Sequence, residues 1–495
     1  MKRNSLILGA IFVMGMFACK KESPKKDPIE SGTTYMSVSI TLPQELRAEK
    51  EDDKHNLVGE WEGRDEIKNV DIYLVANGKV EPKTLNATSQ GGTIYETSPF
   101  STTGGTKKIY VVVNNNGDVK AALDNAATIG ADAFDKAYRE AYDVITKGDD
   151  GAVKGEYAKV EGGKDIIIMT GTPVEKMIQD GVTKEQAAAM NKVSVAVRRL
   201  ASRVLVTKDK DLESKVEIIA TSGAVKKVLG ELQNLKWTVA QYDKKSYLHS
   251  FGDKISAIDV KSPAFDFIPS SRDDYESQAR DKYDYSLLVD RSEIVVKGPS
   301  LTEESMLSSM KYITETTHKY AKLPEVSGYV RGNTTYVMVE GKFVPNKEVF
   351  AAGEFGKANV DGTIYLGTKT GLFYRDKDVA IAANDGGAQI GGKDGVIEFK
   401  EGKMFYFAWL NPDELTATTW NSSPVIRNNI YNVNVKSFSK YGFSGNPYNP
   451  GVDNEDPDPD DPTPDPKDPI YDKETYMTTE ITVIKWGTHS YNINF

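Results

Sequence analysis

Residues Thr34–Leu42 have the sequence TYMSVSITL, in which polar and apolar side chains alternate. Because successive side chains of a β-strand point to opposite faces, this alternation predicts a strand with one face in a core. We expect the inward face to consist of Met36, Val38, Ile40 and Leu42.

The other end of the chain carries a near copy of this stretch. Residues Thr475–Val483 have the sequence TYMTTEITV, and five of the nine positions are identical to those of Thr34–Leu42. Two strands with the same inward face can occupy the same groove. Convergence of two amphipathic strands is the alternative, although alternation alone does not require Tyr-Met and Ile-Thr in the same register. The inward residues of the second copy are Met477, Thr479, Ile481 and Val483.

An acidic, proline-rich stretch separates this second copy from the body of the chain. Residues 453–469 interleave Asp and Glu with six prolines. Proline fixes φ and like charges repel, so we expect an extended, solvated linker over residues 444–473, whose proline-rich part reaches on the order of 50 Å. A calcium-binding loop is the alternative, but proline between the acids opposes the tight wrapping that ligation needs. The strand-like segment 474–495 therefore need not dock on its own domain.

The start of the chain has the pattern of an export signal. Lys2 and Arg3 precede the apolar run Leu6–Ala18, which is too short to span a membrane and ends at Cys19, the only cysteine. We interpret residues 1–18 as a signal peptide and Cys19 as the acylated first residue of a lipoprotein, held on a membrane by its acyl chains. With no second cysteine, stability must come from core burial and not from disulfides.

A polar stretch suited to proteolysis follows the first strand. Residues Pro43–Lys54 contain a single arginine, Arg47. A cut between Arg47 and Ala48 by an arginine-specific protease would release residues 19–47, a lipidated propeptide that contains the first strand. In this hypothesis the first strand is a placeholder, and a neighbouring chain supplies its replacement through main-chain ladder bonds. Such a head-to-tail contact does not close, so filaments follow.

The body of the chain has the pattern of a mainly β protein with small helical insertions. Many short strands at this spacing are typical of β-sandwiches. Helices are expected at Ala131–Lys147, from its apolar spacing, and from Thr183 to Met190, from a capping-box pattern. A polar stretch between Ser250 and Phe267 suggests two domains, residues 48–258 and 259–443. Strands are predicted at Val70–Val75, Lys108–Val113, Ser194–Val197, Ser202–Val206, Thr334–Val339, Met404–Trp409 and Asn429–Val435.

Composition and motifs argue against nucleic-acid binding and against catalysis. The formal net charge is −10, which disfavours contact with phosphates. The four histidines are far apart and no Gly-x-Ser-x-Gly elbow is present, so we expect no metal site, no cofactor and no enzyme. Gly387–Asp394 has phosphate-loop spacing, but Asp394 would repel a phosphate, and a glycine-rich hairpin is the better interpretation. Tyr406, Trp409 and Trp420 could bind glycans, although strand aromatics more often belong to the core.

Taken together, the sequence resembles the Bacteroidetes fimbrillin family, and within it the shaft subunits of the short (minor) fimbriae. The resemblance implies two transthyretin-like β-sandwich domains, an extended C-terminal donor strand and transport to the outer membrane as a lipoprotein. It also implies maturation at Arg47–Ala48 and polymerisation with identical subunits by donor-strand exchange from Thr475 onward. The resemblance is densest at Tyr35–Ser37, Val58–Trp61, Arg331–Val337, Ala408–Pro412, Ser423–Tyr431 and Val483–Phe495.

Two hypotheses follow for the function. The first is a structural subunit of a cell-surface fimbrium, with anchor and tip subunits as further partners and a role in adhesion and biofilm formation. Anchor subunits of the family keep their first strand, so the cuttable Arg47 favours a shaft subunit. The second is a monomeric surface lipoprotein, or a tip or accessory adhesin, that binds glycan or host protein while its tail folds back on its own domain.

Overall fold

The computed structural model describes the chain in sixteen segments. They are residues 33–42, 64–91, 93–115, 117–143, 146–147, 153–154, 157–212, 216–222, 225–249, 260–298, 304–319, 328–387, 395–410, 424–450, 465–470 and 477–485. The fold is mainly β, as predicted, and the seven strands predicted above all overlap observed strands. The transthyretin-like sandwiches implied by the resemblance stay a prediction.

The first large sheet is built from residues 34–199. Its strand order is β3-β2-β7-β13-β15-β1-β5-β4, with β14 paired to β7 and β6 paired to β1. The first strand of the chain therefore lies inside the sheet. The strands are β1 (Thr34–Thr41), β2 (Val70–Ala76), β3 (Lys79–Leu85), β4 (Ala87–Gly91), β5 (Ile94–Thr97), β6 (Phe100–Thr102), β7 (Gly105–Val113), β13 (Met169–Gly171), β14 (Val174–Ile178) and β15 (Lys192–Arg199).

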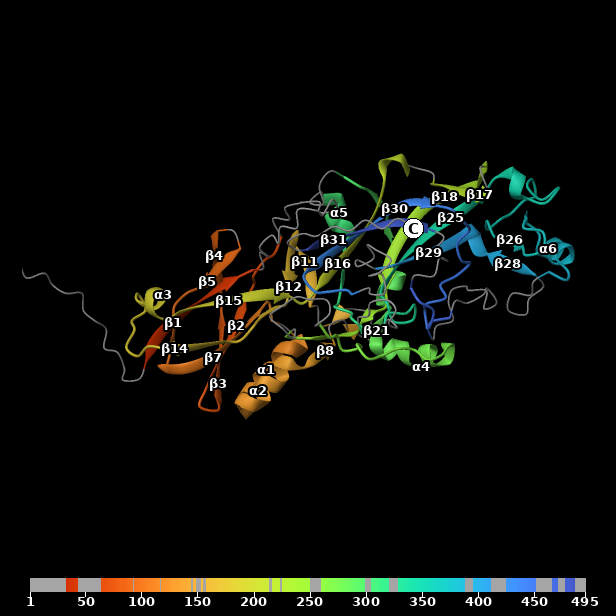
Figure 1. The fold of residues 1–495 in the computed structure, drawn as a ribbon. Coiled ribbons are helices and arrows are strands. Elements are labelled where there is room, and N and C mark those ends of the chain that lie inside the picture. Colours follow the sequence, from red (N-terminus) through yellow and green to blue (C-terminus); the bar gives the residue numbers. More distant parts are fainter. Residues whose placement is uncertain are drawn as a thin grey trace, which may run out of the picture.

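The second large sheet is built from residues after 201. Its strand order is β23-β16-β30-β17-β18-β25-β29, with β22 paired to β18, β24 to β16 and β31 to β30. The two sheets lie at opposite ends of the molecule (Figure 1). The strands are β16 (Ser202–Lys208), β17 (Val216–Ser222), β18 (Val225–Ala240), β22 (Ser292–Glu293), β23 (Val295–Val296), β24 (Lys311–Ile313), β25 (Tyr336–Pro345), β29 (Lys403–Trp409), β30 (Asn429–Phe438) and β31 (Met477–Lys485).

The change of sheet does not coincide with the predicted domain boundary. It falls at Leu200–Ala201, between β15 and β16, and not between Ser250 and Phe267. The strands β16, β17 and β18, predicted to lie in the N-terminal domain, belong to the second sheet because β16 pairs in parallel with β30. Later parts of the chain also return to the first core, where Leu248 and Ile430 are buried.

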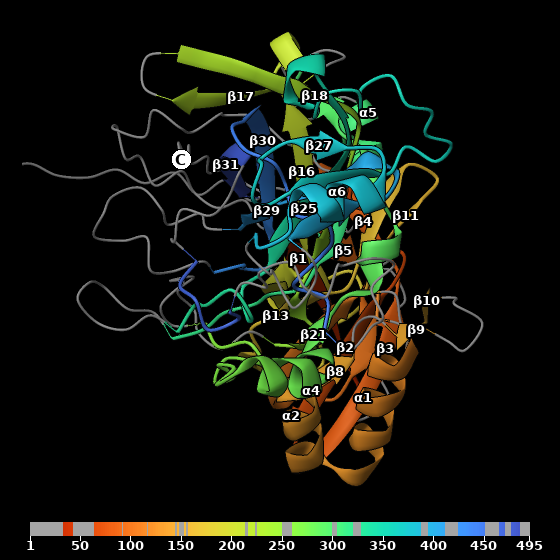
Figure 2. The same ribbon diagram turned by 90° about the vertical axis from the view of Figure 1, so that its right-hand side faces the viewer.

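Helices and short strands cover the two sheets. The helices α1 (Gly117–Ile129) and α2 (Ala131–Arg139) lie beside β2 and β3 of the first sheet (Figure 2). Phe134 of α2 packs on the rings of Tyr73 in β2 and Tyr110 in β7. The remaining helices are α3 (Ala187–Met190), α4 (Arg272–Lys282), α5 (Glu304–Ser309) and α6 (Lys377–Ala383), and the 3₁₀ turns are η1 (Lys210–Leu212), η2 (Ser286–Val289), η3 (Lys347–Val349) and η4 (Lys400–Gly402).

Two predicted helices are shorter than expected. The helix that begins at Ala131 ends at Arg139, because the next residues form a strand that pairs with a distant one, β20. The helix expected from Thr183 covers only Ala187–Met190. The short strands pair as β8 (Ala141–Asp143) with β20 (Lys245–Tyr247), β9 (Thr146–Lys147) with β10 (Val153–Lys154), β11 (Ala158–Glu161) with β12 (Lys164–Ile167), β19 (Tyr242–Asp243) with β21 (Tyr283–Asp284), and β26 (Ile364–Gly367) with β27 (Phe373–Tyr374) and β28 (Val396–Phe399).

The described parts of the predicted linker are not free spacers. Residues 444–450 and 465–470 pack on the second sheet, and Tyr448 and Ile470 are buried in its aromatic core cluster. The backbone N–H of Gly332 donates to the carbonyl of Pro466 at 2.8 Å. Apolar side chains on either side of the acidic stretch explain this docking. For residues 451–464 and 471–473, which lie outside the described residues, the spacer role stays a prediction.

Candidate functional site: the groove of the first strand

The backbone of β1 is hydrogen-bonded along both edges. On one side β1 runs parallel to β15, with Ser37 opposite Lys192 and Thr41 opposite Ala196. On the other side it runs antiparallel to β6 in its first half and to β5 in its second half. An inserted strand therefore satisfies two rows of backbone groups that its removal would leave unpaired. We call the space that β1 fills, between β15 on one side and β5 with β6 on the other, the groove.

The inward face of β1 is part of the first hydrophobic core. Met36, Val38 and Ile40 have 0% exposure and Leu42 has 4%. Burial of four such side chains contributes about 1.5–3 kcal/mol each, or roughly 6–12 kcal/mol as an upper estimate. That sum is comparable to the whole stability of a domain, about 5–15 kcal/mol. The first sheet therefore requires an occupant in this position.

The outer face of β1 is polar and carries an ion pair beside it. Ser37 and Ser39 are buried, and Ser39 stands opposite Glu96 of β5. The Lys192 ammonium, from β15, pairs with the Glu96 carboxylate. This bridge crosses over β1 from one neighbouring strand to the other, and its half-exposed position limits its contribution to about 1 kcal/mol or less.

The N-terminal end of β1 enters a small buried polar cluster. The Thr34 hydroxyl donates to the Gln179 carbonyl at 2.7 Å and accepts the Val182 N–H at 3.0 Å. The Asn191 amide donates to the Tyr35 carbonyl at 2.9 Å and to the Gln179 carbonyl at 3.0 Å. Thr34 and Asn191 both have 0% exposure, so these bonds form away from water.

The second copy of the strand motif lies on the second sheet. The backbone of β31 pairs antiparallel with β30, with Ile481 opposite Val433 and Val483 opposite Tyr431. Val433 and Tyr431 belong to the second hydrophobic core. The near-repeat at the C-terminus thus pairs with one edge of β30 in its own chain.

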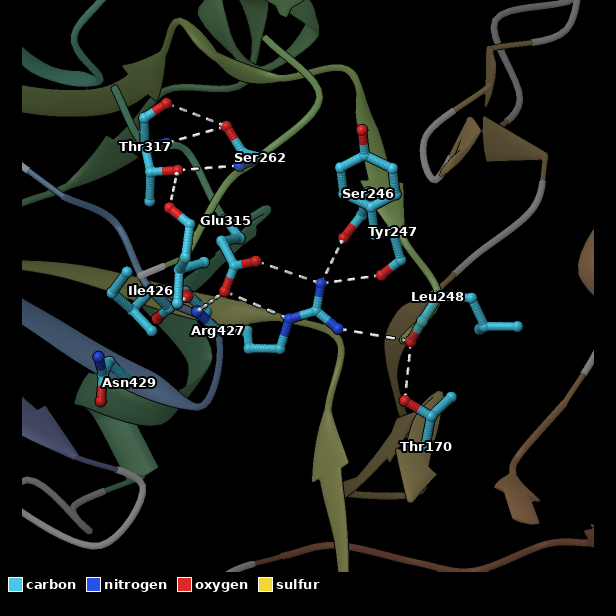
Figure 3. A network of polar contacts seen from close by, with 12 residues as sticks. Thr170, Ser246, Tyr247, Leu248, Ser262, Glu315, Thr317, Ile426, Arg427 and Asn429 are labelled. Atoms are coloured by element: carbon cyan, nitrogen blue, oxygen red, sulfur yellow. Dashed lines mark hydrogen bonds and ion pairs between the residues drawn. The ribbon is translucent and has the colours of Figure 1, made fainter. Parts of the chain in front are cut away.

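A buried polar network holds the two sheets together. The Arg427 guanidinium pairs with the Glu315 carboxylate at 3.3 Å, and each side chain has 3% exposure. Arg427 also donates to the Tyr247 carbonyl at 2.8 Å, and the neighbouring Leu248 carbonyl accepts the Thr170 hydroxyl of β13 at 2.7 Å (Figure 3). The network therefore runs from the second sheet into the first.

A second set of buried charges reinforces this joint. Asp165 pairs with Arg203, which lies on β16 of the second sheet, and also accepts the Tyr312 hydroxyl at 3.0 Å. Arg199 pairs with Asp65 and donates to the Asn428 amide oxygen at 2.7 Å. Breaking one partner of a buried pair costs about 3–5 kcal/mol, so the relative orientation of the sheets is strongly fixed.

Comparison with known proteins decides the family. The model for the C-terminal part of fimbrillin, "Major fimbrial subunit protein type IV", matches residues 397–492. The chain is 38% identical to the minor fimbrium subunit Mfa1 of Porphyromonas gingivalis over 524 positions, covering 100% of both chains. The chain belongs to the fimbrillin family. As a member of it, this fimbrillin is a fimbrial subunit of the minor-fimbrium type, with a role in cell adhesion at the cell surface.

The solved structures that the chain matches are more distant in sequence. A putative cell adhesion protein from Parabacteroides distasonis is 11% identical with a TM-score of 0.43, covering 93% of this fimbrillin and 100% of that chain. The fimbrilin of Porphyromonas gingivalis W83 is 14% identical with a TM-score of 0.39, covering 90% and 96%. The relatives that the chain matches in sequence are fimbrial subunits and not enzymes.

The residues predicted for this fimbrillin divide into three groups. The placeholder residues Met36, Val38, Ile40 and Leu42 lie together on the buried face of one strand. The donor residues lie in β31, where the structure describes the backbone alone. Cys19, Arg47, Ala48 and Trp420 lie outside the described residues, so lipidation and cleavage stay predictions.

Other candidate sites of this fimbrillin have structural roles. Tyr406 and Trp409, considered for glycan binding, are buried in the core clusters of the second sheet. Of the phosphate-loop look-alike, only Gly387 is described, and its N–H donates to the Asn384 carbonyl at 2.8 Å. The described residues include no cluster of His, Cys, Asp and Glu that could hold a metal ion, and no helix among them is long and apolar enough to cross a membrane.

Sequence reasoning missed Asn191, which contacts the first residues of β1. A single buried asparagine has no signature in the sequence. The available signal was the identity of Thr34 with Thr475, because alternation of apolar residues does not explain a shared threonine at the polar start of both strands.

Proposed function

We propose that this fimbrillin is exported as an outer-membrane lipoprotein through Cys19, cut after Arg47 by an arginine-specific protease, and polymerised head-to-tail by donor-strand exchange. The placeholder leaves with residues 19–47, and the C-terminal segment of another copy takes its place. The product is the shaft of a fimbrium that supports adhesion and biofilm formation. Anchor and tip subunits are its further partners by analogy with the family.

The observation that carries this proposal is the position of β1. It is bonded along both edges and fills the core, yet the polar stretch Pro43–Lys54 that follows it contains a single arginine, Arg47. A strand that contributes roughly 6–12 kcal/mol cannot leave without a substitute. The substitute must match the groove, and the segment from Thr475 does so at most positions.

The match extends to individual core positions. Met477 and Ile481 are identical to Met36 and Ile40, and Val483 replaces Leu42 conservatively. Thr479, in place of Val38, is the one polar residue at an inward position. A hydroxyl there costs part of the burial free energy, but the backbone ladder is unaffected.

Exchange requires β31 to leave β30 and enter the groove of another copy. The number of strands that pair with it in each position favours this move. Among the described strands, β31 is bonded only to β30, along one edge. In the groove, the same residues would have β15 on one side and β5 with β6 on the other. Moving from one paired edge to two increases the number of satisfied backbone groups.

Limited proteolysis tests the proposal. The precursor without residues 1–18 is treated with an arginine-specific protease, the new N-terminus is sequenced, and multimers are resolved by SDS gel electrophoresis. We expect a start at Ala48 and an SDS-resistant ladder, both absent from an Arg47→Lys variant. A product cut after Arg47 that stays monomeric, with or without residues 475–495, contradicts strand exchange.

The pairing of β31 with β30 also favours one alternative. In it the tail belongs permanently to its own domain, and the protein is a monomeric lipoprotein or a tip adhesin. That alternative predicts that deletion of residues 475–495 destabilises the monomer before any cleavage. The shaft hypothesis predicts that the same deletion variant stays folded. It should be unable to donate a strand but should still accept one from another copy.

A further inference from the structure

We propose that Asn191 and the turn Gln179–Val182 fix the register of whichever strand fills the groove, by binding one threonine hydroxyl. In the precursor this is Thr34, and in the fibre it is Thr475 of a neighbouring copy. The inference rests on the strand exchange proposed above and adds the determinant of its alignment.

The Thr34 hydroxyl uses both of its bonding functions. It donates to the Gln179 carbonyl at 2.7 Å and accepts the Val182 N–H at 3.0 Å. The next residue, Tyr35, donates its N–H to the Val182 carbonyl at 3.1 Å. The turn that follows β14 therefore binds the first two residues of β1 before the ladder with β15 begins at Ser37.

Asn191 connects this turn to the strand. Its amide nitrogen donates to the Gln179 and Tyr35 carbonyls, and its amide oxygen accepts the Gln179 N–H at 2.9 Å. Its own carbonyl accepts the Ser37 N–H at 3.4 Å. Asn191 is thus a positioning residue, held by the turn on one side and holding the start of the strand on the other.

The ladder by itself does not fix the register to within two residues. A one-residue slip turns every apolar side chain outward and is strongly disfavoured, but a two-residue slip preserves both the alternation and the backbone bonding pattern. The polar cluster removes this ambiguity, because it accepts a hydroxyl at only one position.

The sequence of the donor makes both two-residue slips unfavourable. A slip in one direction places Lys473 at the position of Thr34, and a slip in the other direction places Met477 there. A methionine leaves the buried Val182 N–H without an acceptor, and a lysine brings a charge into a site with 0% exposure. Thr475 reproduces the bonds of Thr34.

Disulfide trapping between two copies tests the inference. One copy carries Ile94→Cys, since Ile94 is exposed and stands opposite Thr41. The other carries a cysteine at Thr482, which aligns with Thr41, or at Glu480 or Ile484, which report the two slips. Cys19→Ser removes the native thiol from both, and the mixture is cut with the arginine-specific protease and oxidised.

The expected result is cross-linking to position 482, with positions 480 and 484 at background. Thr475→Val in the donor copy, which leaves the acceptor groove unaltered, should raise the slipped products relative to the aligned one by roughly tenfold, as expected when a buried donor loses its acceptor. Asn191→Ala in the acceptor copy should do the same.

The matched control is Thr478→Val. It aligns with Ser37, whose buried hydroxyl has no hydrogen-bond partner among the described residues, so the aligned product should remain dominant. If the fractions of slipped products in both Thr475→Val and Asn191→Ala equal those of the wild type, Asn191 and the threonine hydroxyl do not fix the register, while strand exchange itself still stands. Absence of any cross-link between wild-type copies at all three positions would instead overturn the exchange itself.

Discussion

Replacing Ile40 with alanine in the uncut precursor measures how strongly the placeholder holds the first domain. Ile40 has 0% exposure, pairs with Val195 of β15 and Tyr95 of β5, and lies in the first core. An isoleucine truncated at such a site costs about 2–5 kcal/mol, through lost burial and the cavity that remains. We expect the upper part of this range, because β1 is bonded on both sides and its backbone cannot move to fill the space.

Hydrogen exchange of the β15 amides is the assay, because it reports the opening of this sheet and not that of the whole chain. A loss of about 2–5 kcal/mol corresponds to exchange that is roughly 30- to 5,000-fold faster. The control is Thr41→Ala, a half-buried residue on the opposite face of the same strand, which should change exchange by less than about tenfold.

One result would refute the reasoning. If Ile40→Ala accelerates β15 exchange no more than Thr41→Ala does, the inward face of β1 is not a structural part of the first core. If the difference between the two variants is large, the cut precursor of Ile40→Ala should also form multimers faster than the wild type, because its placeholder dissociates more easily.

Three further predictions address the buried ion pair between the two sheets, the pH dependence of stability and the donor strand. Arg427→Ala should lower the free energy of unfolding by about 3–5 kcal/mol, since Glu315 stays buried without its partner, and the double variant with Glu315→Leu should recover part of this in denaturant titrations. Burial raises the pKa of Asp243 from 3.8 to about 8, so the folded state holds a proton that the unfolded state lacks between these values. The free energy of unfolding should therefore fall as pH rises from 3.8 to about 8, and Asp243→Asn should flatten that slope in thermal melts. Ile481→Asp should abolish the SDS-resistant ladder, while circular dichroism shows a folded monomer. Because Ile481 stands opposite Val433, loss of folding in this variant would instead mean that the tail serves its own domain.

The sequence predicts the strands of this protein well because alternation is a local property. All four inward residues of Thr34–Leu42 are buried, as their spacing indicated. The helix that begins at Ala131 was also located correctly, but its end was not. Its apolar spacing continues past Arg139, yet Ala141–Asp143 pairs with Lys245–Tyr247, about a hundred residues away, and this pairing overrides the local preference.

Long-range pairing also explains why the change of sheet does not coincide with the predicted domain boundary. The strands β15 and β16 have the same β-rich pattern and only two residues between them, yet they join different sheets. The partner of β16 is β30, more than two hundred residues later in the chain. Composition cannot reveal this choice, because both strands bury the same kinds of side chain.

The candidate site shows the same division between local and distant information. The inward face of the groove occupant was predictable from nine residues, whereas Asn191 acts through Gln179 and Tyr35, which come from separate parts of the chain. Likewise, the acidic stretch predicted an extended linker over residues 444–473, whereas the buried side chains of Tyr448 and Ile470 show that the described parts of this range dock on the second sheet.

A comparison of the two strands indicates what must drive the proposed exchange. The donor has Thr479 where the placeholder has the fully buried Val38, and Glu480 where it has Ser39, which stands opposite Glu96. The donor therefore fills the groove no better than the placeholder, and side-chain packing cannot explain the direction of exchange. While the chain is intact, the placeholder is present at a local concentration in the millimolar range or above, which a free neighbour does not match. A cut at Arg47 removes this advantage and lets the released peptide diffuse away with its lipid, so that cleavage, and not affinity, sets the direction of assembly.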